Sequence, residues 1–145
     1  MRINPKEISI QSQDGDSWAF EALWRGQRVG YAWCSLQNGN LIINDLKVDD
    51  AHSVPWPFMN SFLVLIGIMP RIKSFRKMGV GNQLLDRIIA EGKKSQVHSI
   101  WGSVTQDDIN GVPYLLDWYK RMGFSVTAPD GNCIKTAVKK IVMKL

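Results

Sequence analysis

The sequence predicts an α+β (mixed α/β) fold in which helices flank a mixed sheet. Three segments, at residues 18–24, 29–36 and 41–48, have the alternating or β-branched character of strands. A helical pattern begins after Gly81, and a further strand-like segment follows at residues 97–104. Because a strand, a helix and a second strand usually form a right-handed parallel unit, we expect an antiparallel N-terminal meander that leads into a βαβ unit.

Tight turns join the first strands. In residues 18–24 the apolar side chains at alternate positions share one face: Trp18, Phe20, Ala22 and Trp24. Residues 25–28 then reverse the chain. Asn38-Gly39 is a strong hairpin signal, because a two-residue loop needs positive φ at both positions. Residues 8–11 are a candidate short edge strand for this meander.

The next segment, residues 49–75, does not continue the sheet pattern. It contains Pro55, Pro57 and Pro70 and an apolar stretch at residues 58–69. We expect a long excursion with one helix after the Pro-Trp-Pro turn. A connection of this length in a small domain is usually functional or mobile.

Helical spacing characterises residues 82–92, where apolar residues recur every three or four positions: Leu84, Leu85, Ile88 and Ile89. Gly92 is a natural stop for this helix. A short helix at residues 114–122 is bounded by Pro113 and Gly123, which is the asymmetry expected at helix ends. Two final strands are expected at residues 124–127 and 137–145.

Composition favours one globular domain and excludes several classes of protein. The chain has 145 residues, of which 45% are apolar and 21% charged, so we expect a single domain over residues 1–145. Its two cysteines, Cys34 and Cys133, lack CxxC spacing, which argues against a zinc ribbon and favours reduced thiols in a cytoplasmic protein. The two histidines lack a metal-binding spacing, so no metal is expected. The longest apolar run, residues 62–69, is too short for a membrane span, and no membrane partner is expected.

The excess positive charge is concentrated around one glycine-containing motif. The net charge is +5, and residues 69–94 carry seven basic and two acidic side chains, while the rest of the chain is neutral overall. Residues 76–81 read Arg-Lys-Met-Gly-Val-Gly and directly precede the amphipathic helix. The glycines permit a tight turn, and the helix start offers free N–H groups and the positive end of the helix dipole. The pattern predicts a pyrophosphate cradle, and on its own it also fits a basic turn before a surface helix.

With a second motif, the sequence resembles the Gcn5-related N-acetyltransferase (GNAT) family. That family has a central strand, then Q/R-x-x-G-x-G/A and a helix, which correspond here to residues 40–48, 76–81 and 82–92. A later family signature, Tyr-x-x-x-Gly-Phe at the end of a short helix, stands at residues 119–124. The two motifs occur in the family's order, with a strand between them. The resemblance covers residues 18–145 and implies a GNAT-like fold with splayed central parallel strands.

The resemblance also implies a binding site for acetyl-CoA as the acyl donor. The family's glycine motif holds the pyrophosphate, which corresponds here to Arg76, Lys77, Met78, Gly79, Val80, Gly81 and Asn82. Backbone at the end of the preceding strand pairs with the pantetheine arm, which corresponds to Leu46, Lys47 and Val48. The tyrosine of the late motif, Tyr119, is the candidate general acid that protonates the leaving thiolate. A phenol suits this role because its unperturbed pKa of about 10 keeps it protonated at neutral pH.

Several carboxylates are candidates for the general base that an acceptor amine requires. Asp45 on the central strand is the main candidate, with Asp49 and Glu21 as alternatives. Asn44 and Asp45 are adjacent on this strand and are therefore expected on opposite faces of the sheet. A solvated surface position is the commoner role for each of these carboxylates.

Three features depart from the family pattern. The excursion is an atypically long insertion, at about residues 50–75. Val112 stands where family members often have an asparagine near the pantetheine. The helices that usually follow the first strand are missing, because few residues separate the edge strand from Trp18. Residues 58–71 are a candidate replacement for the wall that those helices give the acceptor site.

The leading functional prediction is an acetyl-CoA-dependent N-acetyltransferase in which an amine attacks the thioester directly. One alternative is a basic binding module for nucleic acid or another anionic partner, but the charge flanks a phosphate loop and no aromatic-basic RNA signature occurs. A second alternative is a catalytically silent GNAT-like protein that binds coenzyme A. The acceptor stays open among small amines, antibiotics, amino acids, peptide N-termini and protein lysines. Residues 58–69 are a candidate homodimer interface.

Overall fold

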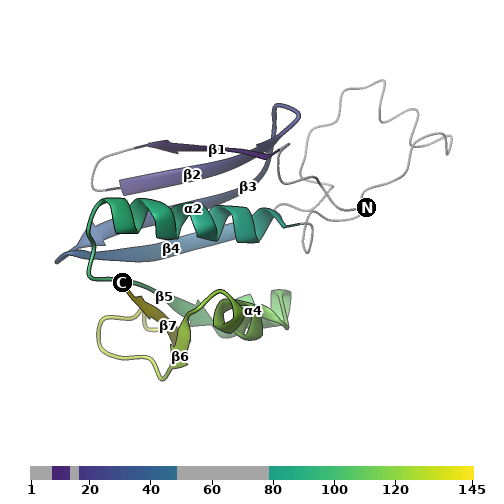
Figure 1. Ribbon diagram of the computed structural model, residues 1–145. Helices are drawn as coiled ribbons and strands as arrows, with labels where there is room; N and C mark the ends of the chain where they lie inside the picture. The colour runs from purple at the N-terminus through teal and green to yellow at the C-terminus, as the bar shows by residue number, and fades with distance from the viewer. Residues whose placement is uncertain (1–7, 14–16, 49–78) are drawn as a thin grey trace, which may run out of the picture.

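The computed structural model describes residues 8–13, 17–48 and 79–145. Within these ranges the chain forms one sheet with the strand order β1-β2-β3-β4-β5-β7-β6. The strands are β1 (Ile8–Gln13), β2 (Ser17–Trp24), β3 (Gln27–Gln37), β4 (Asn40–Val48), β5 (Ser99–Thr105), β6 (Ser125–Thr127) and β7 (Ala137–Lys144). The helices are α2 (Val80–Lys94), α3 (Gln106–Gly111) and α4 (Leu115–Arg121). In Figure 1, α2 packs against β1–β4, and α4 lies beside the half formed by β5–β7.

The N-terminal meander is confirmed, because β1 to β4 pair consecutively and antiparallel. Two-residue turns join these strands at Arg25-Gly26 and Asn38-Gly39. In each turn the first residue has φ of 51° and the glycine has φ of 77°. The edge strand β1 extends two residues beyond the predicted stretch. The turn chemistry thus fixes the register of the sheet from β2 to β4.

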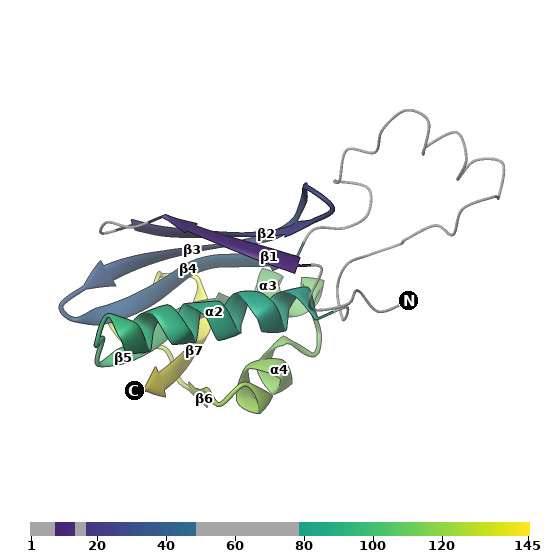
Figure 2. The ribbon, with the colours of Figure 1, turned by 45° about the horizontal axis from the view of Figure 1, so that its top comes forward.

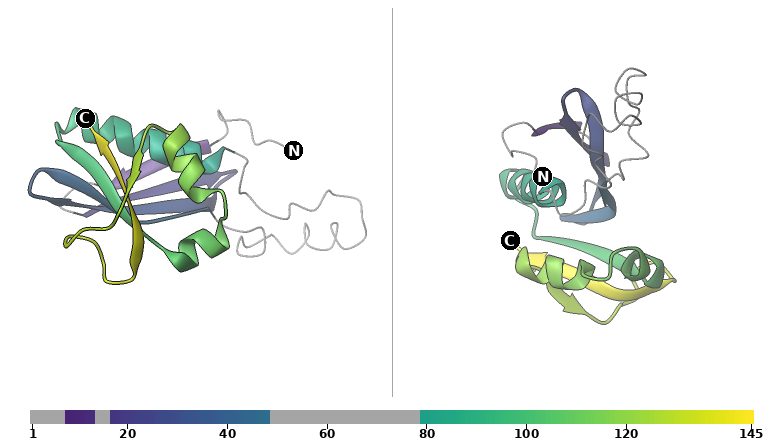
Figure 3. Two further views of the ribbon diagram at one scale, coloured as in Figure 1. Left: turned by 90° about the horizontal axis from the view of Figure 1, so that it is seen from below. Right: turned by 90° about the vertical axis from the view of Figure 1, so that its right-hand side faces the viewer.

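The two halves of the sheet meet at a short parallel seam between β4 and β5. Their pairing covers only Leu41–Ile100, Ile42–Trp101 and Ile43–Gly102. Beyond Ile43 the two strands no longer pair, as the predicted splay requires. In the right-hand view of Figure 3 the halves turn away from each other, with α2 seen nearly end-on beside them. The seam therefore leaves a gap between the carboxyl ends of β4 and β5.

Helix α2 fills one face of the sheet with a fully buried stripe of Val80, Leu84, Leu85 and Ile88. Figure 2 shows this helix running along β3 and β4. Gly30 on β3 lets it come close, because a Cβ there would lie 3.0 Å from Val80 Cγ1 and 3.1 Å from Leu84 Cδ1. This packing holds the first turn of α2 beside the end of β4.

One helix was not predicted. No element was expected between the strand at residues 97–104 and the short helix at residues 114–122, whereas residues 106–111 form α3. A capping box starts this helix: Asp108 N–H donates to Thr105 Oγ1, and Thr105 N–H donates to Asp108 Oδ2. Because Thr105 also ends β5, the chain passes from strand to helix without a loop.

The excursion and its expected helix lie outside the described residues. Among the residues that the structure does describe, no helix is long and apolar enough to cross a membrane.

Candidate active-site cleft

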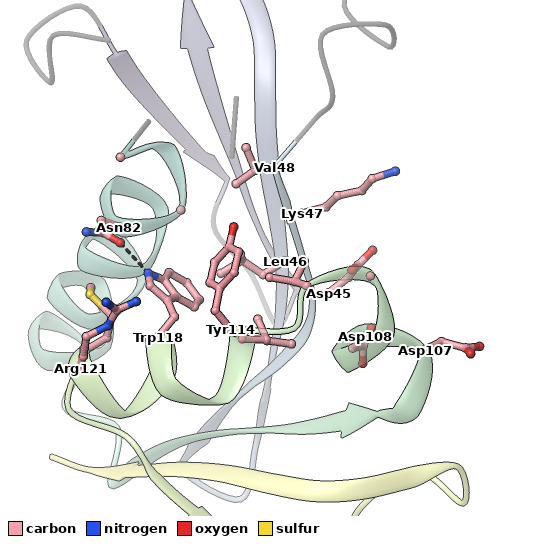
Figure 4. Close-up of a pocket in the computed structure, with 16 residues that line it drawn as sticks. Asp45, Leu46, Lys47, Val48, Asn82, Asp107, Asp108, Tyr114, Trp118 and Arg121 are labelled. Carbon is pink, nitrogen blue, oxygen red and sulfur yellow. Dashed lines mark hydrogen bonds between the residues drawn. The ribbon is translucent and has the colours of Figure 1, made fainter. Parts of the chain in front are cut away.

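A cleft of about 870 Å³ opens where the sheet splays. Its walls come from the end of β4, the start of α2, and the α3–α4 region (Figure 4). On β4 both faces contribute: Asp45 and Lys47 pair with outer-face residues of β3, whereas Leu46 and Val48 pair with Ala32 and Gly30 on the α2 side. The cleft therefore runs through the sheet and can be approached from both faces.

A β-bulge in β4 positions the polar residues of this wall. Trp33 of β3 pairs with Asp45 and Cys34 pairs with Ile43, so Asn44 is an extra residue. Asn44 Nδ2 donates to Ser35 Oγ at 3.0 Å, and the Tyr31 hydroxyl donates to Asp45 Oδ2 at 2.8 Å. Because Tyr31 and Ser35 share one face of β3, Asn44 and Asp45 do too. The expectation that Asn44 and Asp45 lie on opposite faces is wrong, because the bulge interrupts the alternation.

The edge of β4 that faces the gap has no partner in β5. Leu46, Lys47 and Val48 pair with β3 on one side, while the ladder with β5 stops at Ile43. Backbone N–H and C=O groups in such a position need partners from elsewhere. An extended amide-containing molecule lying in the gap can supply them, as an added strand would.

The first turn of α2 presents an anion-binding end to the same gap. Gly79 precedes the helix with φ of 88°, and no side chain caps the helix start among the described residues. Gln83 N–H donates to Gly79 O, so the free N–H groups belong to the residues between them. A Cβ on Gly79 would meet nothing within 4 Å, which leaves open space beside these N–H groups. The helix dipole adds positive potential where a phosphate can bind.

Trp118 on α4 supports this turn from across the cleft. Its indole Nε1 donates to Asn82 Oδ1 at 2.6 Å (Figure 4). A Cβ on Gly81 would lie 3.2 Å from the Trp118 ring and 3.6 Å from Val48 Cγ2. The second glycine of the motif is thus needed for close packing of α2, α4 and β4.

Solved structures share this architecture. A GNAT family acetyltransferase from Elizabethkingia anophelis with acetyl-CoA bound has a TM-score of 0.63 at 13% identity, over 96% of this chain and 99% of that chain. The PaiA N-acetyltransferase from Thermoplasma acidophilum, in complex with coenzyme A, has a TM-score of 0.60 at 15% identity, over 90% and 62%. An acetyltransferase of the GNAT family from Staphylococcus aureus has a TM-score of 0.60 at 16% identity, over 89% and 68%.

The chain has the GNAT fold. It spans less than two thirds of the length of the Thermoplasma chain. Neither a protein-family model nor a curated protein sequence matches it. At these identities the likeness concerns the fold, so the remaining site residues are described by their own geometry.

On this GNAT fold, Tyr119 lies deep in α4. It is only 6% exposed, packs against Trp118 and Phe124, and does not line the cleft wall. Burial raises the pKa of its phenol, and electrostatic interactions with Asp108, Cys34 and Asp45 raise it further. The described residues contain no buried side-chain oxygen that lacks a partner, yet none of them bonds the Tyr119 hydroxyl. The hydroxyl therefore keeps a small contact with solvent.

Tyr114 is a cleft residue that was not predicted from the sequence. Its ring stands in the middle of the cleft in Figure 4, between Trp118 and Leu46. Its only signal in the sequence is its position directly after Pro113, at the start of a helix. Arg121, Asp107 and Asp108 also line the cleft without having been predicted as site residues. Asp107 and Asp108 lie on α3, a helix that was not predicted, and Arg121 lies in the last turn of α4.

The other predicted residues divide into three groups. The cleft is lined by most of the described ones: Asp45, Leu46, Lys47, Val48, Gly79, Gly81 and Asn82. Val112, which replaces the asparagine of the family pattern, also lines it. Val80 is instead fully buried beneath the helix start. Arg76, Lys77, Met78 and the alternative base Asp49 lie outside the described residues.

Charge is distributed unevenly along the cleft. Arg121 lies beside Asn82 and Trp118 at the α2 side, whereas Asp107 and Asp108 lie at the α3 side (Figure 4). Across the described ranges, no group of three or more His, Cys, Asp or Glu side chains could hold a metal ion. The electrostatics thus suit an anionic group near α2 and a cationic group near α3.

Proposed function

We propose that this chain is an N-acetyltransferase that transfers the acetyl group of acetyl-CoA to an amine by direct attack. One observation carries the proposal: the uncapped start of α2 opens onto the same gap as the unpaired edge of β4. An anionic pyrophosphate joined to an extended diamide arm requires these two features side by side. The GNAT fold of the chain supports the assignment.

The binding roles follow from this arrangement. The N–H groups at Val80, Gly81 and Asn82 would hold the pyrophosphate, and Arg76, Lys77 and Met78 with Gly79 complete the motif in the sequence. The backbone of residues 46–48 would bond the amides of the pantetheine arm. Bound in this way, acetyl-CoA supplies an acyl group activated as a thioester.

The chemical roles go to two residues. Transfer forms a C–N bond to the amine and breaks the C–S bond of the thioester. Asp45, on the outer face of β4, is proposed to accept the proton that the attacking ammonium must lose. Tyr119 is proposed to donate a proton to the departing sulfur. Burial raises the pKa of its phenol, so the group is protonated at neutral pH.

Calorimetry with coenzyme A tests the binding part of the proposal. Gly79→Ala should weaken binding at least about tenfold, because the substitution is strained at φ of 88° directly before the N–H groups of the cradle. Gly26→Ala is a matched control: Gly26 also has positive φ and open space for a Cβ, but it lies in the β2–β3 turn. No binding of coenzyme A at high micromolar concentration would refute the proposal.

An acetylation assay separates the remaining alternatives. A chain that binds coenzyme A but transfers no acetyl group to any amine in a broad panel would be a silent GNAT-like protein. Steeply salt-dependent binding of DNA or RNA without affinity for coenzyme A would instead indicate the basic binding module.

A further inference from the structure

The carboxylate of Asp45 is held by a side chain of the neighbouring strand. The Tyr31 hydroxyl donates to Asp45 Oδ2 at 2.8 Å. In the ladder Trp33 is the direct partner of Asp45, and Tyr31 lies two residues away on the same face of β3. Such a diagonal neighbour is within reach of a long aromatic side chain. The Tyr31 ring therefore carries a hydroxyl from β3 to the wall of the cleft that Asp45 forms.

The Tyr31 ring has a partner of its own on the outer face of the sheet. The Arg28 guanidinium lies over the ring, with Cζ 5.0 Å from the ring centroid. A cation over the face of an aromatic ring is attracted to it. Arg28, Tyr31 and Asp45 thus form a row in which a cation holds the ring and the ring's hydroxyl holds the carboxylate.

The β-bulge creates this contact together with a second one. Asn44, the extra residue of the bulge, donates from Nδ2 to Ser35 Oγ at 3.0 Å. Two hydroxyls of β3 therefore bond two successive side chains of β4 on one face of the sheet. Asp45 lines the cleft, whereas Asn44 does not. Of the two bonds, the one from Tyr31 is the one that acts on a cleft residue.

A fixed carboxylate matters because a base must lie within hydrogen-bond reach of the proton that it takes. Asp45 is exposed, so without a partner its side chain would populate several rotamers. In Figure 4 the Lys47 side chain extends away from Asp45. The bond to the Tyr31 hydroxyl restricts the carboxylate and occupies one of its two oxygens.

Resting on the acetyl transfer proposed above, we infer that Tyr31 is a positioning residue for Asp45 in that reaction. The hydroxyl holds Oδ2, and Oδ1 takes a proton from the ammonium group of the acceptor. An N–H bond breaks, an O–H bond forms on Oδ1, and the electron pair stays on the nitrogen, which then attacks the thioester. Asp45 afterwards returns the proton to solvent. Tyr31 keeps its own proton and acts only through Asp45.

Tyr31→Phe tests the inference, because it removes the hydroxyl and keeps the ring beneath Arg28. With the amine of the acetylation panel that the unmodified chain acetylates fastest, kcat should fall about three- to tenfold, the value of one hydrogen bond. KM for acetyl-CoA and the affinity for coenzyme A should stay constant, since Tyr31 does not line the cleft. Ser35→Ala is the matched control, because it removes the other β3 hydroxyl at the bulge and should leave kcat unchanged.

A double-mutant cycle with Asp45→Asn distinguishes positioning from a general loosening of the sheet. In the Asp45→Asn background, Tyr31→Phe should cause no further loss of kcat, because its effect passes through the carboxylate. Additive losses would overturn the inference, as would an unchanged kcat in Tyr31→Phe or an equal loss in Ser35→Ala.

Two further measurements separate this inference from the proposed function. The carboxyl ¹³C resonance of Asp45 should shift in Tyr31→Phe and stay in place in Ser35→Ala, which tests the bond without any acceptor. A resonance that does not move in Tyr31→Phe would overturn the positioning role even in an active enzyme. A chain in which the resonance shifts but no amine of the panel is acetylated would overturn the acetyltransferase proposal, and the role of Tyr31 in it.

Discussion

The indole of Trp118 and the amide of Asn82 are joined by a hydrogen bond of 2.6 Å between Nε1 and Oδ1. This bond links α4, which carries Tyr119, to the first turn of α2. The bond therefore fixes the position of the proposed proton donor relative to the proposed phosphate cradle.

Trp118→Phe should therefore weaken coenzyme A binding about three- to tenfold, the value of one ordinary hydrogen bond. The substitution also removes the indole atoms Cζ2 and Cη2 that lie nearest Gly81, so the free energy of unfolding should fall by about 1–3 kcal/mol. Calorimetry and denaturant titration measure the two effects. In a double-mutant cycle with Asn82→Ala, purely additive effects would show that the bond does not position the helix.

Tyr119→Phe should lower kcat at least tenfold while coenzyme A affinity stays nearly constant, because the variant keeps the ring and loses only the hydroxyl. Tyr114→Phe is the informative comparison, since Tyr114 stands in the cleft and is the other tyrosine that could supply a proton. Because the pKa of Tyr119 is raised, no loss of kcat from its ionisation is expected up to about pH 10. A larger loss of kcat in Tyr114→Phe would transfer the acid role to that residue.

The stability of the fold should fall in alkaline solution. Burial raises the pKa of the Cys34 thiol to about 12 and also raises that of Tyr119. Between the unfolded and folded pKa values the unfolded chain has lost a proton that the folded chain keeps, so rising pH favours unfolding. Each group contributes a slope of about 1.4 kcal/mol per pH unit, starting near pH 9 for the thiol and near pH 10 for the phenol.

Denaturant titrations from pH 7 to 11 measure this slope. Cys34→Ala should flatten the curve between about pH 9 and 10, whatever its effect at pH 7. Cys133→Ala is the matched control, because Cys133 is only partly buried. An identical slope in the two variants would contradict the assignment to Cys34.

Gly102→Ala should destabilise the seam between the halves of the sheet. A Cβ there would lie 3.1 Å from the backbone oxygen of Ile43, on the strand with which Gly102 pairs. We expect a loss of about 1–3 kcal/mol in the free energy of unfolding, since backbone cannot move aside as a side-chain end can. Gly131→Ala has open space around the new Cβ and serves as control. Equal free energies of unfolding for the two variants would show that the seam can accommodate the added methyl group.

The sequence predicted the features set by local pattern. Alternation and Asn38-Gly39 gave the meander, and the apolar stripe around Leu84 and Ile88 gave α2. The phosphate cradle was predicted because two glycines precede that stripe. These elements depend on the spacing of apolar residues and on turn residues, both of which are visible within one short segment of the sequence.

What the sequence could not reveal depends on partners distant in the chain. The bulge at Asn44 exists only in the register between β3 and β4, so the shared face of Asn44 and Asp45 was missed. Helix α3 has no buried residue and is held by its capping box, so it shows no apolar stripe. The burial of Tyr119 reflects packing against Phe124 and Trp118, which a motif cannot display.

The bulge decides which face of the sheet each side chain at the end of β4 occupies, and so which of them line the outer side of the cleft. Asn44 is one residue inserted into an otherwise regular ladder, and it alone decides which side chains of β4 point outward. Deleting Asn44 would restore a regular ladder and leave Asp45 opposite Trp33 on the outer face. If the same sequence ran through this position without a bulge, alternation would turn Asp45 toward the hydrophobic layer under α2 and Leu46 toward the open side.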